Sequence, residues 1–277
     1  MRTFKIYNND GLAYDLTETR TGFFYNVAGL GMDIETSFQR IGERYEIINS
    51  ALEQADIQGI VRFFQPGAYA QYFEFAQFVQ NTPLYLEYAP EHGTFTRRGV
   101  VTRIGKSESN DGQLIAEVTF KAITPWYKRF AETNEGMTSG GKTYDYSYDY
   151  TYSNNAAQSI EIESDSYQPC PVIITIHGYA LNPTWRHYLN GELVATGAIT
   201  GEIEDGNKLV IDTTSMPYTI REYDANGQLV ADMYQSSDFS TYRFITLGYG
   251  RNVISVGQSA VNAIRMSVEA LIEYATV

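Results

Sequence analysis

The stretch Phe120-Lys121-Ala122-Ile123-Thr124-Pro125-Trp126-Tyr127-Lys128 divides the chain. In the residues that lead into it, 114–120, apolar side chains alternate with mainly polar ones, which is the period of a half-buried strand. Pro125 has no backbone N–H to donate and favours an extended residue before it, so we expect this strand to end there. The polar, glycine-bearing run 131–143 that follows predicts a linker or a long surface loop.

Composition and charge favour two domains. The chain has 277 residues, of which 43% are apolar, and this is enough to give two domains a core each. Residues 1–130 carry 13 Lys and Arg against 15 Asp and Glu, whereas residues 131–277 carry 7 against 18. We therefore predict a first domain at 1–130, a linker at 131–143 and a second domain at 144–277.

The same numbers exclude some classes of function. A net charge of −13 argues against sequence-specific nucleic-acid binding, which requires clustered Lys and Arg. No run approaches the roughly 20 apolar residues that span a bilayer, and residues 1–6 lack the apolar core of a signal peptide. With a single cysteine, Cys170, the chain can form no internal disulfide. We expect a protein that is made in a reducing cytoplasm and has no membrane contact.

The first domain is predicted to be mainly β, as a barrel or a split sandwich with one helix. Short strands are expected before residue 64 and between residues 84 and 120, bounded by glycines and turn residues. Residues 69–80 instead place Tyr72, Phe75, Ala76 and Val79 at helical spacing, which predicts the helix.

The second domain is predicted to be a β-sandwich or jelly roll. The run 144–152 puts tyrosines at every second position, which favours a strand over low-complexity disorder. Many short strand patterns then follow, separated by turns such as Asn190-Gly191 and Asn226-Gly227. Closely spaced short strands of this kind are typical of two packed antiparallel sheets.

Motifs that carry catalysis are few. The three histidines stand in no metal-ligand spacing, and no Gly-x-Ser-x-Gly motif occurs, so we predict no catalytic residue, no cofactor site and no metal site. Trp185 could stack on a sugar while Asn182, Arg186 and His187 hydrogen-bond it. The competing interpretation of Trp185 is a tryptophan half-buried beside a turn.

The order of several short motifs resembles the distal tail protein family of long-tailed siphophages. Residues 60–130 resemble its N-terminal domain in Pro83-Leu84-Tyr85-Leu86-Glu87-Tyr88, Arg97-Arg98-Gly99-Val100-Val101 and Thr124-Pro125-Trp126-Tyr127. The second half is similar to the family's galectin-like sandwich in Pro171-Val172-Ile173-Ile174-Thr175-Ile176-His177-Gly178, Asn182-Pro183-Thr184-Trp185 and Gly250-Arg251-Asn252-Val253-Ile254-Ser255-Val256.

This resemblance implies a structural virion protein and not an enzyme. It implies a homohexameric ring at the distal end of the tail, which joins the tail tube protein to the tail-associated fibre or lysin protein and supports receptor-binding or baseplate proteins. Two rivals remain open. One is a carbohydrate-binding module that contacts the host surface through the second domain, and the other is a glycan hydrolase that uses two of the many carboxylates.

Overall fold

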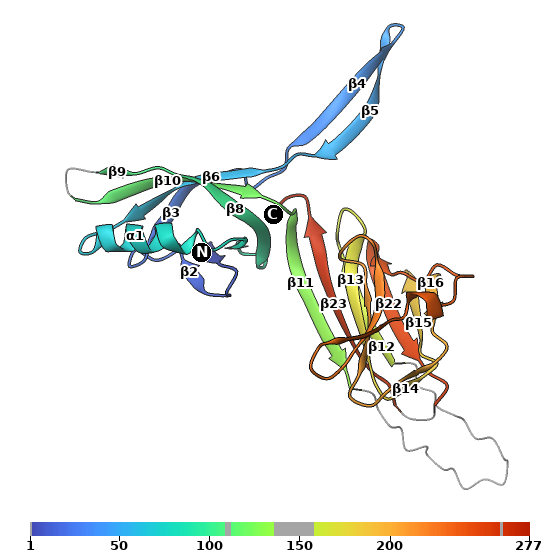
Figure 1. Cartoon of the computed structure of the whole chain (residues 1–277). Helices are drawn as coiled ribbons and strands as arrows, with labels where there is room; N and C mark the ends of the chain where they lie inside the picture. The colour runs from blue at the N-terminus through green and yellow to red at the C-terminus, as the bar shows by residue number, and fades with distance from the viewer. Residues whose placement is uncertain (1, 109–111, 136–157, 261–262) are drawn as a thin grey trace, which may run out of the picture. The chain divides into compact units, whose positions relative to one another are not determined.

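The computed structural model describes residues 2–108, 112–135, 158–260 and 263–277, and it divides the chain into two compact units (Figure 1). Unit 1 comprises Met1–Lys128 and Glu273–Val277, and unit 2 comprises Arg129–Ile272. The chain thus passes from one unit to the other next to the predicted boundary at residue 130. The tyrosine-rich strand predicted at 144–152 lies outside the described residues.

Unit 1 is mainly β with one α-helix among its described residues, as the sequence predicts. Its elements, up to the strand that leads into unit 2, are β1 (Thr3–Tyr7), β2 (Ala13–Asp15), β3 (Phe23–Ala28), β4 (Ile34–Ile41), β5 (Arg44–Leu52), β6 (Asp56–Phe63), α1 (Ala68–Phe78), β7 (Leu84–Ala89), β8 (Phe95–Ile104), β9 (Ser107–Glu108), β10 (Leu114–Ala122) and β11 (Trp126–Asn134).

The main sheet of unit 1 is split and does not close into a barrel. Strand β8 pairs with β7 along its first half and with β10 along its second half, and the change of partner falls at Gly99. A Cβ atom at Gly99 would lie 2.4 Å from the carbonyl oxygen of Lys121, so only glycine permits this close approach. Strands β2-β1-β7 continue from one half of β8, and β10-β6-β3 continue from the other. Of the two predicted alternatives, the split arrangement is therefore confirmed and the barrel is wrong.

Helix α1 lies along one face of this sheet (Figure 1). Phe75 and Val79 are buried, and the Phe75 ring lies 5.2 Å from that of Tyr14 and 5.8 Å from that of Phe63, between ring centres. Glu74 and Gln77 on the opposite side of the helix are exposed. Among the described residues, no helix is both long enough and apolar enough to cross a bilayer.

The prediction that residues 131–143 form a linker is wrong for the first four of them. Strand β11 starts directly after Pro125 and continues to Asn134, pairing with the last strand of unit 2. Its polar residues are mostly exposed, and Arg129 Nη2 forms an ion pair with Glu269 Oε2 at 2.6 Å. Strands at the edge of a sheet commonly carry charged residues, which explains why composition alone indicates a loop here.

The described residues of unit 2 form the remaining strands and one short 3₁₀ helix. They are β12 (Gln158–Ser164), β13 (Cys170–His177), β14 (Ala180–Leu181), β15 (Thr184–Leu189), β16 (Glu192–Ala198), β17 (Glu202–Ile203), β18 (Lys208–Asp212), β19 (Thr219–Tyr223), β20 (Leu229–Asp232), η1 (Tyr234–Ser236), β21 (Thr246–Leu247), β22 (Gly250–Gly257) and β23 (Arg265–Tyr274).

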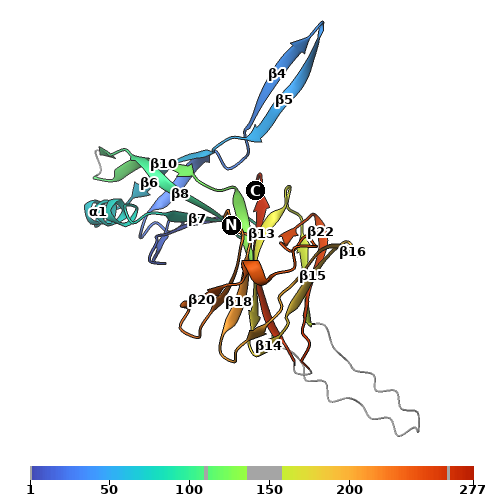
Figure 2. The same ribbon diagram turned by 45° about the vertical axis from the view of Figure 1, so that its right-hand side comes forward.

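Two larger antiparallel sheets form the described part of unit 2, as predicted for a sandwich, and β14 pairs with β17 as a small separate sheet. One has the order β11-β23-β13-β18-β19-β20, and the other has the order β12-β22-β15-β16. Figure 2 shows β13 and β18 in one layer and β22, β15 and β16 in the other. In β12 and β13 every second residue is buried, so each sheet turns an apolar face inward. Residues 242–245 form a loop, and the strand after them, β21, comprises only Thr246 and Leu247.

Candidate interaction site

A two-stranded hairpin, β4–β5, projects from the main sheet of unit 1 (Figure 1). Its tip is the tight turn Gly42-Glu43, where Gly42 has a φ of 65°. Arg40 Nε donates a hydrogen bond of 2.8 Å to the Gly42 carbonyl oxygen and braces the turn. The two strands pair only with each other among the described residues.

The register of the hairpin makes its two faces chemically different. Residues directly opposite in an antiparallel pair lie on the same face, and successive residues alternate between faces. On one face the opposed pairs are Ile34 with Leu52, Thr36 with Ser50, Phe38 with Ile47 and Arg40 with Tyr45. On the other face they are Glu35 with Ala51, Ser37 with Asn49, Gln39 with Glu46 and Ile41 with Arg44. We call the first the apolar face and the second the polar face of the hairpin.

No part of the chain that the structure describes covers the apolar face. The exposed fractions are 52% for Ile34, 59% for Phe38, 69% for Tyr45 and 65% for Ile47. Ile48, the extra residue at the bulge, is 62% exposed. Isolated two-stranded hairpins are at best marginally stable in water, and contiguous exposed apolar surface usually marks a contact with another molecule. The hairpin is therefore the candidate interaction site.

The four residues predicted to contact a sugar do not come together on one surface. Trp185 and His187 point inward from β15 and are buried, whereas Arg186 between them is exposed, as strand alternation requires. Trp185 has no exposed ring face to stack on a sugar, so that prediction is wrong. Its Nε1–H donates a 2.7 Å hydrogen bond to the Arg243 carbonyl oxygen.

Asn182 and His187 both hold parts of unit 2 together. Asn182 has a φ of 46°, and its Oδ1 accepts a 2.9 Å hydrogen bond from the Gly201 backbone N–H. His187 Nε2 lies 3.0 Å from Asn252 Oδ1, and burial lowers the pKa of this imidazole although the contact with Asn252 opposes the shift. In the part of the chain that the structure describes, no group of three or more His, Cys, Asp or Glu residues could hold a metal ion.

The sequence interpretation missed the hairpin. The expectation of short strands bounded by glycines before residue 64 did not identify two long strands paired across Gly42. The available signal was the alternation of Ile34, Thr36 and Phe38 before Gly42 and of Tyr45 and Ile47 after it, which is the pattern of a hairpin with one apolar face.

Comparison with known proteins connects unit 1 to one family. The family model described as "Distal tail protein, N-terminal domain" matches residues 3–123, a range that includes the hairpin, the split sheet and the helix. Residues 3–123 thus match the N-terminal domain of distal tail proteins, over somewhat less than half of the chain. This match assigns residues 3–123 to that domain family and says nothing of the residues after 123.

Solved structures share the fold of this chain over both units. A chain of the phage P2 baseplate in its activated conformation with calcium is similar with a TM-score of 0.65 and 16% identity, and the match covers 100% of both chains. The Dit protein of phage SPP1, described as a paradigm of the hub adsorption apparatus of phages that infect Gram-positive bacteria, is similar with a TM-score of 0.62 and 12% identity. That match covers 96% of this chain and 98% of the other. No curated protein sequence matches the chain.

Proposed function

We propose that the chain is the ring-forming hub of a phage tail tip, and that the apolar face of the β4–β5 hairpin is its subunit contact. The observation that carries this proposal is the row Ile34, Phe38, Tyr45 and Ile47, which lies on one face and is more than half exposed at every position. A lone chain leaves this surface in water, whereas a neighbouring copy in a ring covers it.

A hairpin that projects from one copy onto a different surface of the next makes a heterologous contact. Such contacts close into a ring when the rotation between copies divides a full turn, and they otherwise give open filaments. The resemblance to siphophage distal tail proteins favours closure as a homohexamer. The similarity to baseplate and hub structures supports an assembly with other tail proteins.

The proposed task of the ring is to position other proteins. It joins the tail tube protein to the tail-associated fibre or lysin protein and supports receptor-binding or baseplate proteins through its outer units. Interface area and symmetry supply the binding energy, and no covalent bond is made or broken. The family is one of structural tail proteins, which supports a role without catalysis.

Site-specific photo-crosslinking of the full chain tests this contact. A photoreactive phenylalanine analogue at position 38 stands on the apolar face, and the same analogue at position 39 stands on the polar face of the same strand. We expect irradiation to give covalent dimers at position 38 whose crosslinked peptides map to unit 1 of a second copy, and far fewer dimers at position 39. Equal crosslinking at both positions, or none at either, would contradict the proposal.

A further inference from the structure

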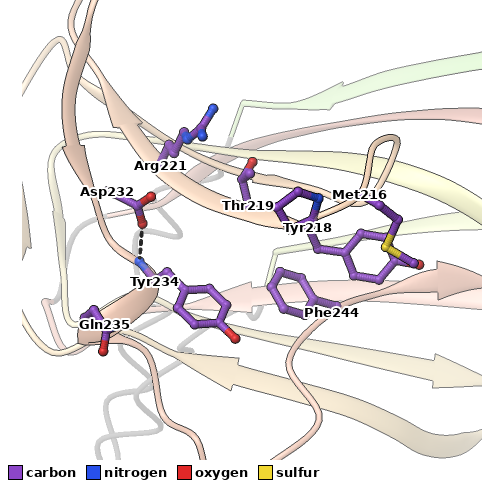
Figure 3. Close-up of a pocket in the computed structure, with 9 residues that line it drawn as sticks. Met216, Tyr218, Thr219, Arg221, Asp232, Tyr234, Gln235 and Phe244 are labelled. Atoms are coloured by element: carbon purple, nitrogen blue, oxygen red, sulfur yellow. Dashed lines mark hydrogen bonds between the residues drawn. The ribbon is translucent and has the colours of Figure 1, made fainter.

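Unit 2 contains a pocket of about 520 Å³ that none of the predicted sites includes (Figure 3). This volume lies within the range of roughly 300–1,000 Å³ that is usual for small-ligand sites. Strand β19 and the residues before it, the end of β20 with η1, and the loop before β21 form the walls. The lining residues are Met216, Pro217, Tyr218, Thr219, Arg221, Asp232, Tyr234, Gln235 and Phe244.

One wall of the pocket is aromatic, and the buried side chain of Arg243 packs against its rings. Tyr218 and Tyr234 flank Phe244, with ring centres 5.2 Å and 6.2 Å from that of Phe244. Arg243 is 9% exposed, and its guanidinium carbon lies 4.7 Å from the Tyr234 ring centre and 5.3 Å from that of Phe244. A buried cation over these rings fixes their orientation.

Trp185 supports this wall. Its indole N–H donates to the carbonyl oxygen of Arg243, the residue directly before Phe244. Trp185, which the sequence suggested as the residue that stacks on a sugar, therefore supports the aromatic wall from behind and does not line the pocket itself.

The other wall is polar and balanced in charge. Arg221 on β19 and Asp232 on β20 are directly paired in register and stand on the same face. Asp232 Oδ1 accepts a 3.0 Å hydrogen bond from the Tyr234 backbone N–H, which orients the carboxylate (Figure 3). Arg221 Nε is buried and, among the described residues, has no hydrogen-bond partner. A buried donor without a partner is costly, so an oxygen atom supplied by a ligand would stabilise it.

These two walls together select a class of ligand. Arg221 and Asp232 cancel each other's charge, so neither a phosphate nor a cation is favoured. A pyranose ring has an apolar C–H face that fits an aromatic wall and hydroxyl groups that both donate and accept hydrogen bonds. We propose that this pocket binds a neutral saccharide, with Tyr234 and Phe244 against the sugar face and Arg221 and Asp232 on its hydroxyl groups.

Saturation-transfer NMR and calorimetry on the full chain test the proposal. The probes are soluble oligosaccharides of neutral hexose and N-acetylhexosamine units, with inorganic phosphate as the anion control. We expect at least one saccharide to bind saturably, and we expect Tyr234→Ala and Arg221→Gln each to weaken that binding about tenfold or more. The control variant Tyr249→Ala changes a tyrosine that is 73% exposed and outside the pocket, so it should bind normally.

Three results would overturn the proposal. They are no saccharide binding up to about 10 mM, binding by phosphate alone, and saccharide binding that neither variant weakens. Melting temperatures show whether each variant is folded. If Tyr234→Ala fails to fold, Arg221→Gln decides, because it leaves the aromatic wall intact. Saccharide binding does not depend on ring assembly, so this test and the crosslinking test can fail separately.

Discussion

Replacing the central cross-strand pair of the apolar face, Phe38→Ser with Ile47→Ser, should separate the copies without unfolding them. The two side chains are 59% and 65% exposed in the single chain. Fully burying such a side chain stabilises by about 1.5–3 kcal/mol, so covering the exposed part contributes about 1–2 kcal/mol for each residue. The pair therefore contributes about 2–4 kcal/mol per contact, which corresponds to a roughly 30- to 1,000-fold weaker association for each contact.

Sedimentation velocity over a range of protein concentrations measures this loss. The matched control is Gln39→Ser with Glu46→Ser, the neighbouring pair on the polar face of the same two strands. We expect the Phe38 and Ile47 variant to stay monomeric at concentrations where the natural chain and the control assemble. Its melting temperature as a monomer should change little, because neither side chain belongs to the core. Assembly of both variants at the natural concentration, or equal loss in both, would refute the reasoning.

Further predictions concern unit 2. Gly197→Ala should lower the free energy of unfolding by about 1–3 kcal/mol, because the new Cβ would lie 2.3 Å from the Trp185 ring. Urea denaturation measures this loss, and an unchanged urea midpoint would contradict this packing. Burial lowers the pKa of His187, so the unfolded chain binds the proton more tightly and the free energy of unfolding falls as the pH drops through about 6.5. Urea denaturation of His187→Gln should show a smaller fall between about pH 7.5 and pH 5 than the natural chain shows. An equal fall in both would refute the role of His187. Arg129→Gln breaks an exposed ion pair with Glu269 and should cost less than about 1 kcal/mol; a larger loss would mean that the pair is more than a surface contact.

Local patterns predicted much of the fold because the relevant residues are close in the sequence. The helix stripe of Phe75 and Val79, the break at Pro125 and the short strands of unit 2 all follow from periods that the chain itself displays. Strand β11, which begins directly after Pro125, could not be predicted from such a local period. Its polar residues are stabilised by pairing with β23, which lies far along the sequence.

The candidate sites were harder to predict than the strands. A single strand pattern indicates that one face is apolar, but it does not show whether the chain covers that face. Ile47 on the hairpin and Ile174 in β13 follow similar patterns, yet the first is 65% exposed and the second is fully buried. The saccharide contacts assigned to Trp185 failed for the same reason, since alternation along β15 turns that ring inward. The pocket unites residues 216–221, 232–235 and 244, which no local spacing connects.

The mass of the purified full chain in native mass spectrometry tests the central claim most directly. The account predicts a species of six times the 31.3 kDa chain mass, alone or stacked in pairs, which the Phe38→Ser and Ile47→Ser substitutions convert to monomer. A chain that stays at 31.3 kDa at every concentration, or one whose oligomer survives those substitutions, would contradict a ring held by the hairpin.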